Sequence, residues 1–356
     1  MPMPTPSSSL SERLGLRIPL IQAPMAGVST PHLAAAVSRA GALGSLGLGA
    51  STVAQARQAI LDTRALTDRP FAVNLFCHAP ARHDPAREAA WLAHLAPLFA
   101  EVQASPPAAL HEIYRSFVED EAMLALLLEL RPAAVSFHFG LPPRDWVQAL
   151  RAAGMYTLAT ATSVQEADRI AEAGVDALVA QGIEAGGHRG LFDPAGPDAC
   201  LPTADLVRDL VGHTALPIVA AGGLMRGQDI RAMLALGAVA AQLGTAFIAC
   251  PESAASDSYR TALLHARGSD TRLTSVFSGR PARGIANRFM TWCEAPGSPP
   301  PPDYPIAYDA AKQLHAAAQR QGVGAHAACW AGTSVARTRV LPAAELVATL
   351  AAELNA

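Results

Sequence analysis

A unit of one short apolar strand followed by one helix recurs eight times between residues 19 and 245, and this recurrence leaves few possible folds. Several of the helices end on an Ala-Gly or Leu-Gly pair and lead almost at once into the next strand, as in RAGALGSLG, RAAGMYTLA, EAGVDALVA and ALGAVAAQL. Apolar strands that alternate with helices indicate a parallel sheet covered on both faces. Because eight such units close naturally into a (β/α)8 barrel, we predict an α/β chain built on a TIM barrel.

The predicted strands are short and apolar. They are placed at residues 19–25, 43–49, 71–76, 133–140, 155–161, 177–180, 217–223 and 239–245. Glycines stand where the first residue after a helix is expected, at Gly41, Gly154, Gly174 and Gly237. A doubly wound open sheet is the alternative fold, and the lack of a GxGxxG motif after the first strand argues against it.

The pattern changes after residue 250. A helix predicted at 254–266 is followed by irregular arginine-rich sequence, a proline run and a second helix at 306–321. We therefore interpret 1–250 as the barrel, 251–330 as a smaller, mostly helical domain over the substrate side of the barrel mouth, and 331–356 as a helix that returns to the barrel.

Charge and cysteine content exclude several classes of function. The formal net charge is −3 and no basic stripe is visible, which argues against a nucleic-acid partner. Five scattered cysteines without a CxxC pair are typical of a reduced protein, not of a disulfide framework or a metal site. The start, MPMPTPSSSLSERLG, lacks a signal peptide's apolar segment, and no run is long enough to span a membrane. We expect a cytoplasmic protein and leave open whether it forms a homodimer.

Polar residues and glycines stand at the carboxyl ends of the predicted strands, where a barrel of this kind builds its active site. Asn74, His138 and Gln181 interrupt strands that are otherwise apolar. Other strand ends carry Pro24, Met25 and Ala26, the pair Gly222 and Gly223, and the pair Gly244 and Thr245. Each residue alone could be a hydrogen-bonded core residue, but together at one rim they indicate a binding site.

The strand ends also suggest the ligand. Backbone N–H groups of the segments after the seventh and eighth strands, together with the Thr245 hydroxyl, suit a phosphate. These segments are Ala221-Gly222-Gly223 and Gln242-Leu243-Gly244-Thr245. The side-chain amides of Asn74 and Gln181 can donate and accept at the edge of a planar ring. A phosphate and a planar heterocycle predict a mononucleotide, and flavin mononucleotide (FMN) fits best.

A glycine-rich loop follows the sixth strand in ALVAQGIEAGGHRG. Gly186 and Gly187 allow backbone N–H groups to approach a ligand closely, which a side chain would prevent. Such loops are also often only tight turns. The polar residues at the neighbouring strand ends are what favour a binding loop here.

His138 lies in SFHFG, and strand alternation places its side chain on the face opposite Phe137 and Phe139, in the barrel interior or mouth. There a histidine could take up a proton as the free base or bind an anion as imidazolium. The alternative is a hydrogen-bonded core histidine.

Lys312 is the one lysine among 27 basic residues, and it stands four residues after Tyr308 and eight after Tyr304. On a helix this spacing places Tyr308 and Lys312 on one face, with Tyr304 near the helix start. Two phenols and an ammonium group on one stripe suit an anionic ligand. The alternative is a solvent-exposed amphipathic face.

Six of these motifs, IQAPMAG, FAVNLF, SFHFG, QGIEAGGHRG, PIVAAGG and QLGTAF, together resemble the nitronate monooxygenases, formerly called 2-nitropropane dioxygenases, and in particular their class I. The match runs from about Ile21 to Lys312. The resemblance implies a TIM barrel with FMN at its mouth. It also implies the oxidation of alkyl nitronates, such as propionate 3-nitronate, by dioxygen to carbonyl compounds and nitrite or nitrate, in a detoxification role without a metal.

The resemblance also implies roles for individual residues. His138 falls on the family's catalytic histidine. The residues that would hold FMN are Asn74, Gln181, Gly186, Gly223, Gln242, Leu243, Gly244 and Thr245. The residues that would line the substrate side are Tyr114, Tyr259, Tyr304, Tyr308 and Lys312, and the sequence around Tyr114 and Tyr259 is poor in motif.

Two other functions remain open. The first is an NAD(P)H-dependent FMN reductase that acts on quinones or enoyl thioesters on the same barrel, since related enzymes share the glycines. SFHFG and the Tyr/Tyr/Lys stripe favour the nitronate enzyme. The second is a flavin-binding barrel without catalytic activity. The preferred nitronate is not predicted.

Overall fold

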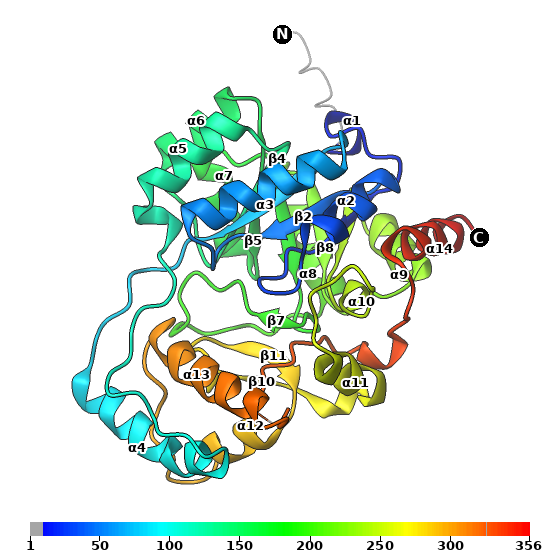
Figure 1. Cartoon of the computed structure of the whole chain (residues 1–356). Coiled ribbons are helices and arrows are strands. Elements are labelled where there is room, and N and C mark those ends of the chain that lie inside the picture. The colour runs from blue at the N-terminus through cyan, green and yellow to red at the C-terminus, as the bar shows by residue number, and fades with distance from the viewer. Residues whose placement is uncertain (1–9, 325) are drawn as a thin grey trace.

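The computed structural model describes residues 10–324 and 326–356, so residues 1–9 of the Pro/Ser-rich leader lie outside the described part. Eight parallel strands form one sheet in the order β1-β9-β8-β6-β5-β4-β3-β2. A parallel bridge between Ile21 and Leu43 joins the two ends of this order and closes the barrel. The predicted TIM barrel is therefore confirmed, and the open-sheet alternative is wrong (Figure 1).

Seven of the eight barrel strands lie within the predicted runs, and β6 extends one residue beyond its run. They are β1 (Leu20–Gln22), β2 (Gly44–Gly47), β3 (Phe71–Phe76), β4 (Ala134–His138), β5 (Tyr156–Ala161), β6 (Ala177–Gln181, one residue longer than predicted), β8 (Ile218–Ala221) and β9 (Ala240–Leu243). The residues that follow the carboxyl ends of these strands are therefore loop residues at the barrel mouth, and their backbone need not be extended.

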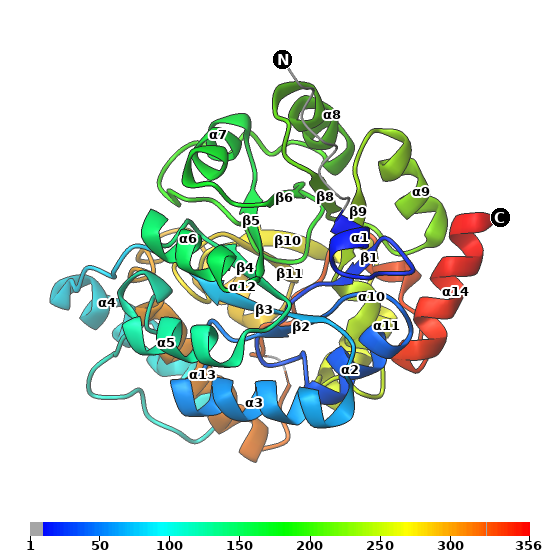
Figure 2. The same ribbon diagram turned by 90° about the horizontal axis from the view of Figure 1, so that it is seen from above.

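A ring of helices surrounds the barrel when it is viewed along its axis (Figure 2). The ring consists of α2 (Pro31–Arg39), α3 (Val53–Leu66), α5 (Glu121–Leu130), α6 (Arg144–Ala152), α7 (Val164–Ala173), α8 (Thr203–His213), α9 (Gly227–Ala235) and α14 (Ala343–Asn355). Helix α14 packs against both α9 and α2, so the last helix of the ring lies beside the first.

Local capping explains where several helices begin and end. Thr30 caps α2 with its side chain, and Pro31 occupies the first turn as predicted. Thr52 and Gln55 form a reciprocal capping box at the start of α3. The four glycines predicted to follow helices all have positive φ, which favours glycine because a Cβ would be strained there.

The apolar core has two layers. One layer fills the barrel interior with residues such as Ile21, Val179 and Val219, and the short helix α1 (Leu10–Arg13) packs Leu10 against it. The larger layer lies between the sheet and the helix ring. This double-sided burial is what continuous apolar strands require.

A second group of elements lies below the barrel mouth in Figure 1. It contains α11 (Asp257–His265), α12 (Arg288–Cys293), α13 (Ile306–Arg320) and an antiparallel sheet of β7 (Gly187–His188), β10 (Thr271–Thr274) and β11 (Ala282–Ile285). Helix α4 (Pro85–Glu101), from the barrel half of the sequence, packs against α12 and α13. Neither this sheet nor the position of α4 was predicted.

No helix in residues 10–324 and 326–356 combines the length and the hydropathy needed to cross a membrane. The remaining α-helix of the described residues, α10 (Thr245–Ile248), follows β9 and lies at the barrel mouth.

Candidate active site

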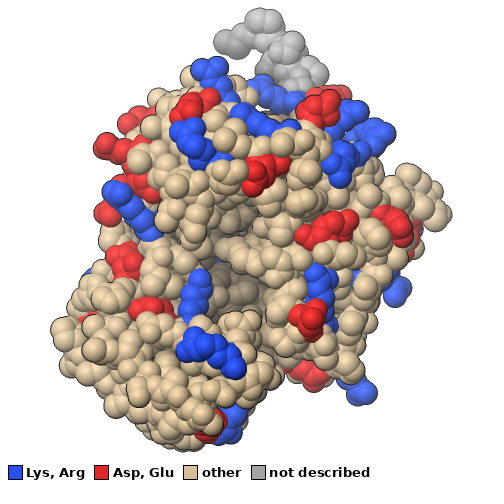
Figure 3. Space-filling view, in the orientation of Figure 1, with Lys and Arg blue, Asp and Glu red and all other residues tan. Residues whose placement is uncertain are grey.

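A cavity of about 670 Å³ lies at the carboxyl ends of the barrel strands, within the size range of cofactor and ligand sites. Figure 3 shows the surface hollowed between the barrel and the elements below it. The predicted site residues that line the cavity are Pro24, Met25, Ala26, Asn74, Tyr114, His138, Gln181, Gly186, Gly187, Gly222, Gly223, Gln242, Gly244, Thr245, Tyr259, Tyr304, Tyr308 and Lys312. The structure thus brings together residues from most of the chain.

Leu243 is the predicted site residue that does not line the cavity. Its side chain is buried in the core between the sheet and the helices. Its carbonyl oxygen accepts a hydrogen bond from the Ala23 N–H at 2.8 Å. Strand geometry accounts for this, because Gln242 and Leu243 point to opposite faces of β9.

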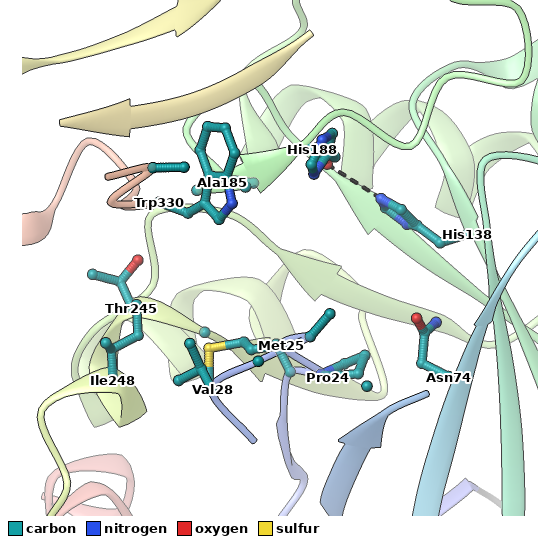
Figure 4. A pocket seen from close by; sticks show the side chains of 18 of the residues that line it. Pro24, Met25, Val28, Asn74, His138, Ala185, His188, Thr245, Ile248 and Trp330 are labelled. Atoms are coloured by element: carbon teal, nitrogen blue, oxygen red, sulfur yellow. Dashed lines mark hydrogen bonds between the residues drawn. The ribbon is translucent and has the colours of Figure 1, made fainter. Parts of the chain in front are cut away.

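His138 ends β4, where it pairs with Phe76 of β3. Its side chain projects into the cavity (Figure 4). Its Nε2 lies 3.2 Å from the carbonyl oxygen of His188, and its Nδ1 lies 3.0 Å from Oγ1 of Thr160. Because a carbonyl oxygen only accepts, Nε2 carries the hydrogen and Nδ1 accepts from the Thr160 hydroxyl.

Burial lowers the pKa of His138 to about 4, and the nearby guanidinium groups of Arg280 and Arg189 act in the same direction. The ring is therefore neutral near pH 7. Of the two roles considered for His138, the low pKa favours the neutral ring that accepts a proton over the imidazolium that binds an anion.

The residue after His138 departs from the predicted alternation. Phe137 is fully buried on the helix side of the sheet and stacks on Phe117, as expected. Phe139 follows the strand end with a φ of 73° and lines the cavity, its ring centroid 4.5 Å from that of His138. The prediction that Phe139 faces away from His138 is wrong, because β4 ends at His138 and the left-handed turn redirects the chain.

Gln181 lines the cavity, but both ends of its amide bind the glycine-rich loop. Its Nε2 donates to the His188 carbonyl at 2.9 Å, and its Oε1 accepts the Gly190 N–H at 2.8 Å. The fully buried Arg189 donates to the carbonyl oxygen of Gln181 and pairs with Asp198, with an Nε–Oδ2 distance of 2.7 Å. Gln181 therefore holds the loop beside His138. The second hydrogen of its Nε2 has no partner among the described residues, so a contact of this amide with a heterocycle stays a prediction.

Asn74 keeps one hydrogen-bonding atom available. Its Nδ2 donates to the hydroxyl and carbonyl oxygens of Ser136, at 2.9 and 3.2 Å. Its Oδ1 has no partner among the described residues and lies in the cavity wall. An acceptor held in this way suits an N–H group at the edge of a planar ring.

The glycine segments after β8 and β9 leave room for a ligand. Gly223 has a φ of 69°, which only glycine adopts readily. A Cβ built on Gly244 would touch only Ala23 and Met25, at 3.5 Å or more, so the glycine lies against open space and not against packed chain. Thr245 Oγ1 accepts the Gly332 N–H at 3.0 Å, which leaves its hydroxyl hydrogen available to donate. These residues fit a phosphate group.

Tyr114, Tyr304, Tyr308 and Lys312 form one wall of the cavity, which we call the phenolic wall. The Lys312 Nζ lies 4.8 Å from the ring centroid of Tyr114 and 5.4 Å from that of Tyr308. Burial raises the pKa of all three tyrosines, so the phenols stay protonated and can donate. Partial burial lowers the pKa of Lys312, and Asp309 opposes this shift.

The hydroxyl groups of this region differ in availability. The hydroxyls of Tyr114 and Tyr304 have no partner among the described residues. Tyr259 also lines the cavity, but its hydroxyl donates to the carbonyl oxygen of Trp330. Tyr259 therefore shapes the cavity while its polar group is used within the fold.

The residues that line the cavity but were not predicted include Thr160, His188, Trp330 and Ser334. His188 hydrogen-bonds Ser278 Oγ through Nε2 at 2.8 Å, and burial lowers its pKa to about 3. The motif GGHRG contains His188 and could have suggested it. An isolated β-bridge between Trp330 and Gly284 of β11 holds Trp330 beside the cavity. This is a tertiary contact, and no local sequence pattern predicts it.

Comparison with known proteins agrees with this geometry. A family model described as nitronate monooxygenase matches residues 7–353. The chain belongs to the nitronate monooxygenase family. It is 57% identical to a nitronate monooxygenase of Pseudomonas aeruginosa over 96% of this chain and 97% of the relative. It is 55% identical to one of Paraburkholderia phytofirmans over 99% of this chain and 96% of the relative. The predicted family is confirmed, and the chain is an enzyme of a flavin-dependent oxidoreductase family.

Solved structures agree as well. Nitroalkane oxidase from Streptomyces ansochromogenes superimposes with a TM-score of 0.90 at 40% identity, over 98% of both chains. FabK from Thermotoga maritima has a TM-score of 0.73 at 25% identity, over 98% of this chain and 96% of that chain. Among the described residues, no group of three or more His, Cys, Asp or Glu side chains is placed to hold a metal ion.

Proposed function

We propose that this enzyme binds FMN and uses dioxygen to oxidise small anionic nitronates to carbonyl compounds and nitrite or nitrate. The observation that carries the proposal is the phenolic wall, whose donors and one ammonium group line the same cavity as a neutral His138. Detoxification of nitronates in the cytoplasm is the role that we propose for this reaction.

The cavity supports FMN as the flavin. Gly223, Gly244 and Thr245 would hold the phosphate, and the unpartnered Oδ1 of Asn74 would accept an N–H group of the ring. One phosphate site without a dinucleotide motif favours FMN over a flavin dinucleotide. When bound, the flavin supplies the electron transfer from substrate to dioxygen, and the protein supplies placement and electrostatics.

The phenolic wall supports an anionic substrate. A nitronate carries its negative charge on two oxygen atoms, which can accept several hydrogen bonds at once. The unpartnered hydroxyls of Tyr114 and Tyr304 can donate to these atoms, and Lys312 balances their charge. These groups would hold the substrate against the flavin end of the cavity.

His138 is proposed to act as a neutral base and not as an anion site. Its Nε2 hydrogen is directed to the His188 carbonyl, and Thr160 donates to its Nδ1. The Thr160 hydroxyl can rotate, which would leave Nδ1 able to receive a proton during turnover.

An oxygen electrode tests the proposal. The full-length holoenzyme is mixed with propionate 3-nitronate, with and without NADH. Steady oxygen uptake that needs no NADH is expected. Uptake that depends on NADH would favour the flavin reductase, and the absence of uptake under both conditions would favour a barrel without catalytic activity.

A further inference from the structure

The C-terminal segment 331–335 runs across the glycine segments that follow β8 and β9. The Gly332 N–H donates to Thr245 Oγ1 at 3.0 Å, and the Thr333 N–H donates to the carbonyl oxygen of Glu184 at 3.1 Å. Gly332 and Ser334 both line the cavity. A Cβ built on Gly223 would lie 3.6 Å from Ser334 Oγ, so the serine hydroxyl lies beside the β8 segment.

The Ser334 hydroxyl is not used by the fold. Ser334 occupies the N-cap position of the 3-10 turn Val335–Arg337, where a serine side chain commonly caps, yet it makes no capping hydrogen bond. Its hydroxyl has no other hydrogen-bond partner in the described ranges. Since the Thr245 hydroxyl hydrogen is also available, two hydroxyl donors border the same glycine segments.

Within the described part of the chain, no Lys or Arg side chain lines this end of the cavity. Among the described residues that line it, Lys312 is the sole Lys or Arg, and it belongs to the phenolic wall. A phosphate held beside Gly223 and Thr245 would therefore depend on backbone N–H groups and hydroxyls. Where only neutral donors are present, each contributes a large share of the affinity.

We propose that Ser334 donates a hydrogen bond to the cofactor's phosphate, and that segment 331–335 forms the third side of the phosphate site. The inference rests on the proposed FMN site and adds the C-terminal segment to it. The segment is held at both ends, which fixes the hydroxyl in place. Gly186 packs against the Ala331 carbonyl carbon with no room for a side chain. Arg339 donates to the Met225 carbonyl at 3.0 Å and pairs with Glu353 at 2.9 Å.

The test compares FMN with riboflavin, which has the same ring and ribityl chain but no phosphate. Full-length protein stripped of flavin is titrated with each ligand, for the wild type, S334A and the neighbouring control T333V. Thr333 does not line the cavity, so T333V removes a hydroxyl next to the proposed site and not within it. S334A should raise the Kd of FMN about ten-fold or more and leave the Kd of riboflavin unchanged, whereas T333V should change neither.

Two results would overturn this inference alone: an unchanged Kd of FMN in S334A, or an equal weakening of FMN and riboflavin. A wild-type protein that binds neither flavin would overturn the proposed function and this inference together.

Discussion

The two walls of the cavity differ in whether their polar groups are already hydrogen-bonded within the fold. One wall, which we call the barrel wall, consists of His138, Gln181 and the loop that runs to Gly190. The polar side chains of this wall form hydrogen bonds with the loop backbone. On the phenolic wall, Tyr114 and Tyr304 keep hydroxyls without partners in the described structure, and an ammonium group lies beside them. The contrast indicates that the barrel wall fixes geometry, whereas the phenolic wall is prepared to receive an anion.

His138→Ala should have the largest effect on activity. The imidazole lies on a different strand from the phosphate segments, so the variant should retain flavin while kcat/KM falls roughly a hundred- to ten-thousand-fold. His213, exposed and paired with Asp168, provides the control His213→Ala, which should keep wild-type activity. Unchanged kcat/KM in flavin-loaded His138→Ala would mean that this histidine belongs only to the core.

Arg189→Met tests the rigidity of the barrel wall. Arg189 is 1% exposed, so removing it leaves Asp198 and two backbone carbonyls without their donor. The free energy of unfolding should fall by about 3–5 kcal/mol. The matched control is Arg208→Met, which removes an exposed ion pair with Asp205 and should cost less than about 1 kcal/mol. If denaturant titrations gave the same loss of unfolding free energy for both variants, the buried Arg189–Asp198 pair would not be what holds the loop.

Lys312→Met tests the charge on the phenolic wall. The KM for a nitronate should rise about ten-fold or more, since an ionic hydrogen bond contributes about 1.5–3 kcal/mol. The rise should be larger for propionate 3-nitronate, with its second negative charge, than for a simple alkyl nitronate. Arg320→Met, at the exposed end of the same helix, is the control. A wild-type KM for both substrates, with lower thermal stability, would assign Lys312 a structural role.

Tyr304→Phe and Tyr259→Phe distinguish a phenol with a free hydroxyl from one whose hydroxyl is bonded within the fold. Both side chains are buried, but only the Tyr259 hydroxyl is already bonded, to the Trp330 carbonyl. Loss of one hydrogen bond to substrate, about 1 kcal/mol, should raise KM roughly five-fold in Tyr304→Phe. Tyr259→Phe should instead lower stability and leave KM almost unchanged. The reverse pattern in steady-state kinetics would show that the unpartnered hydroxyl is not the one that binds substrate.

The barrel wall could be predicted from sequence because strand register places its residues. Asn74 and His138 each end or interrupt a short apolar strand, and parallel strands bring these positions to one rim. The same logic failed one residue later at Phe139, where a left-handed turn replaces the strand.

The surroundings of the phenolic wall depend on contacts between distant segments, and these leave little local trace. The helical spacing suggested Tyr308 and Lys312, but nothing nearby indicated that Trp330 or Ser334 would reach the cavity. The contacts of Gln181 with the loop were also not predicted, because an amide suited to a flavin edge is equally suited to holding a loop.

The proposed function requires that a nitronate, and not a nicotinamide, reduces the flavin. The direct measurement is the visible flavin absorbance of the anaerobic holoenzyme after rapid mixing with propionate 3-nitronate, and separately with NADH. We expect fast bleaching by the nitronate and recovery of the absorbance when oxygen is admitted. Rapid bleaching by NADH with none by the nitronate would contradict the proposed function and identify the enzyme as a flavin reductase.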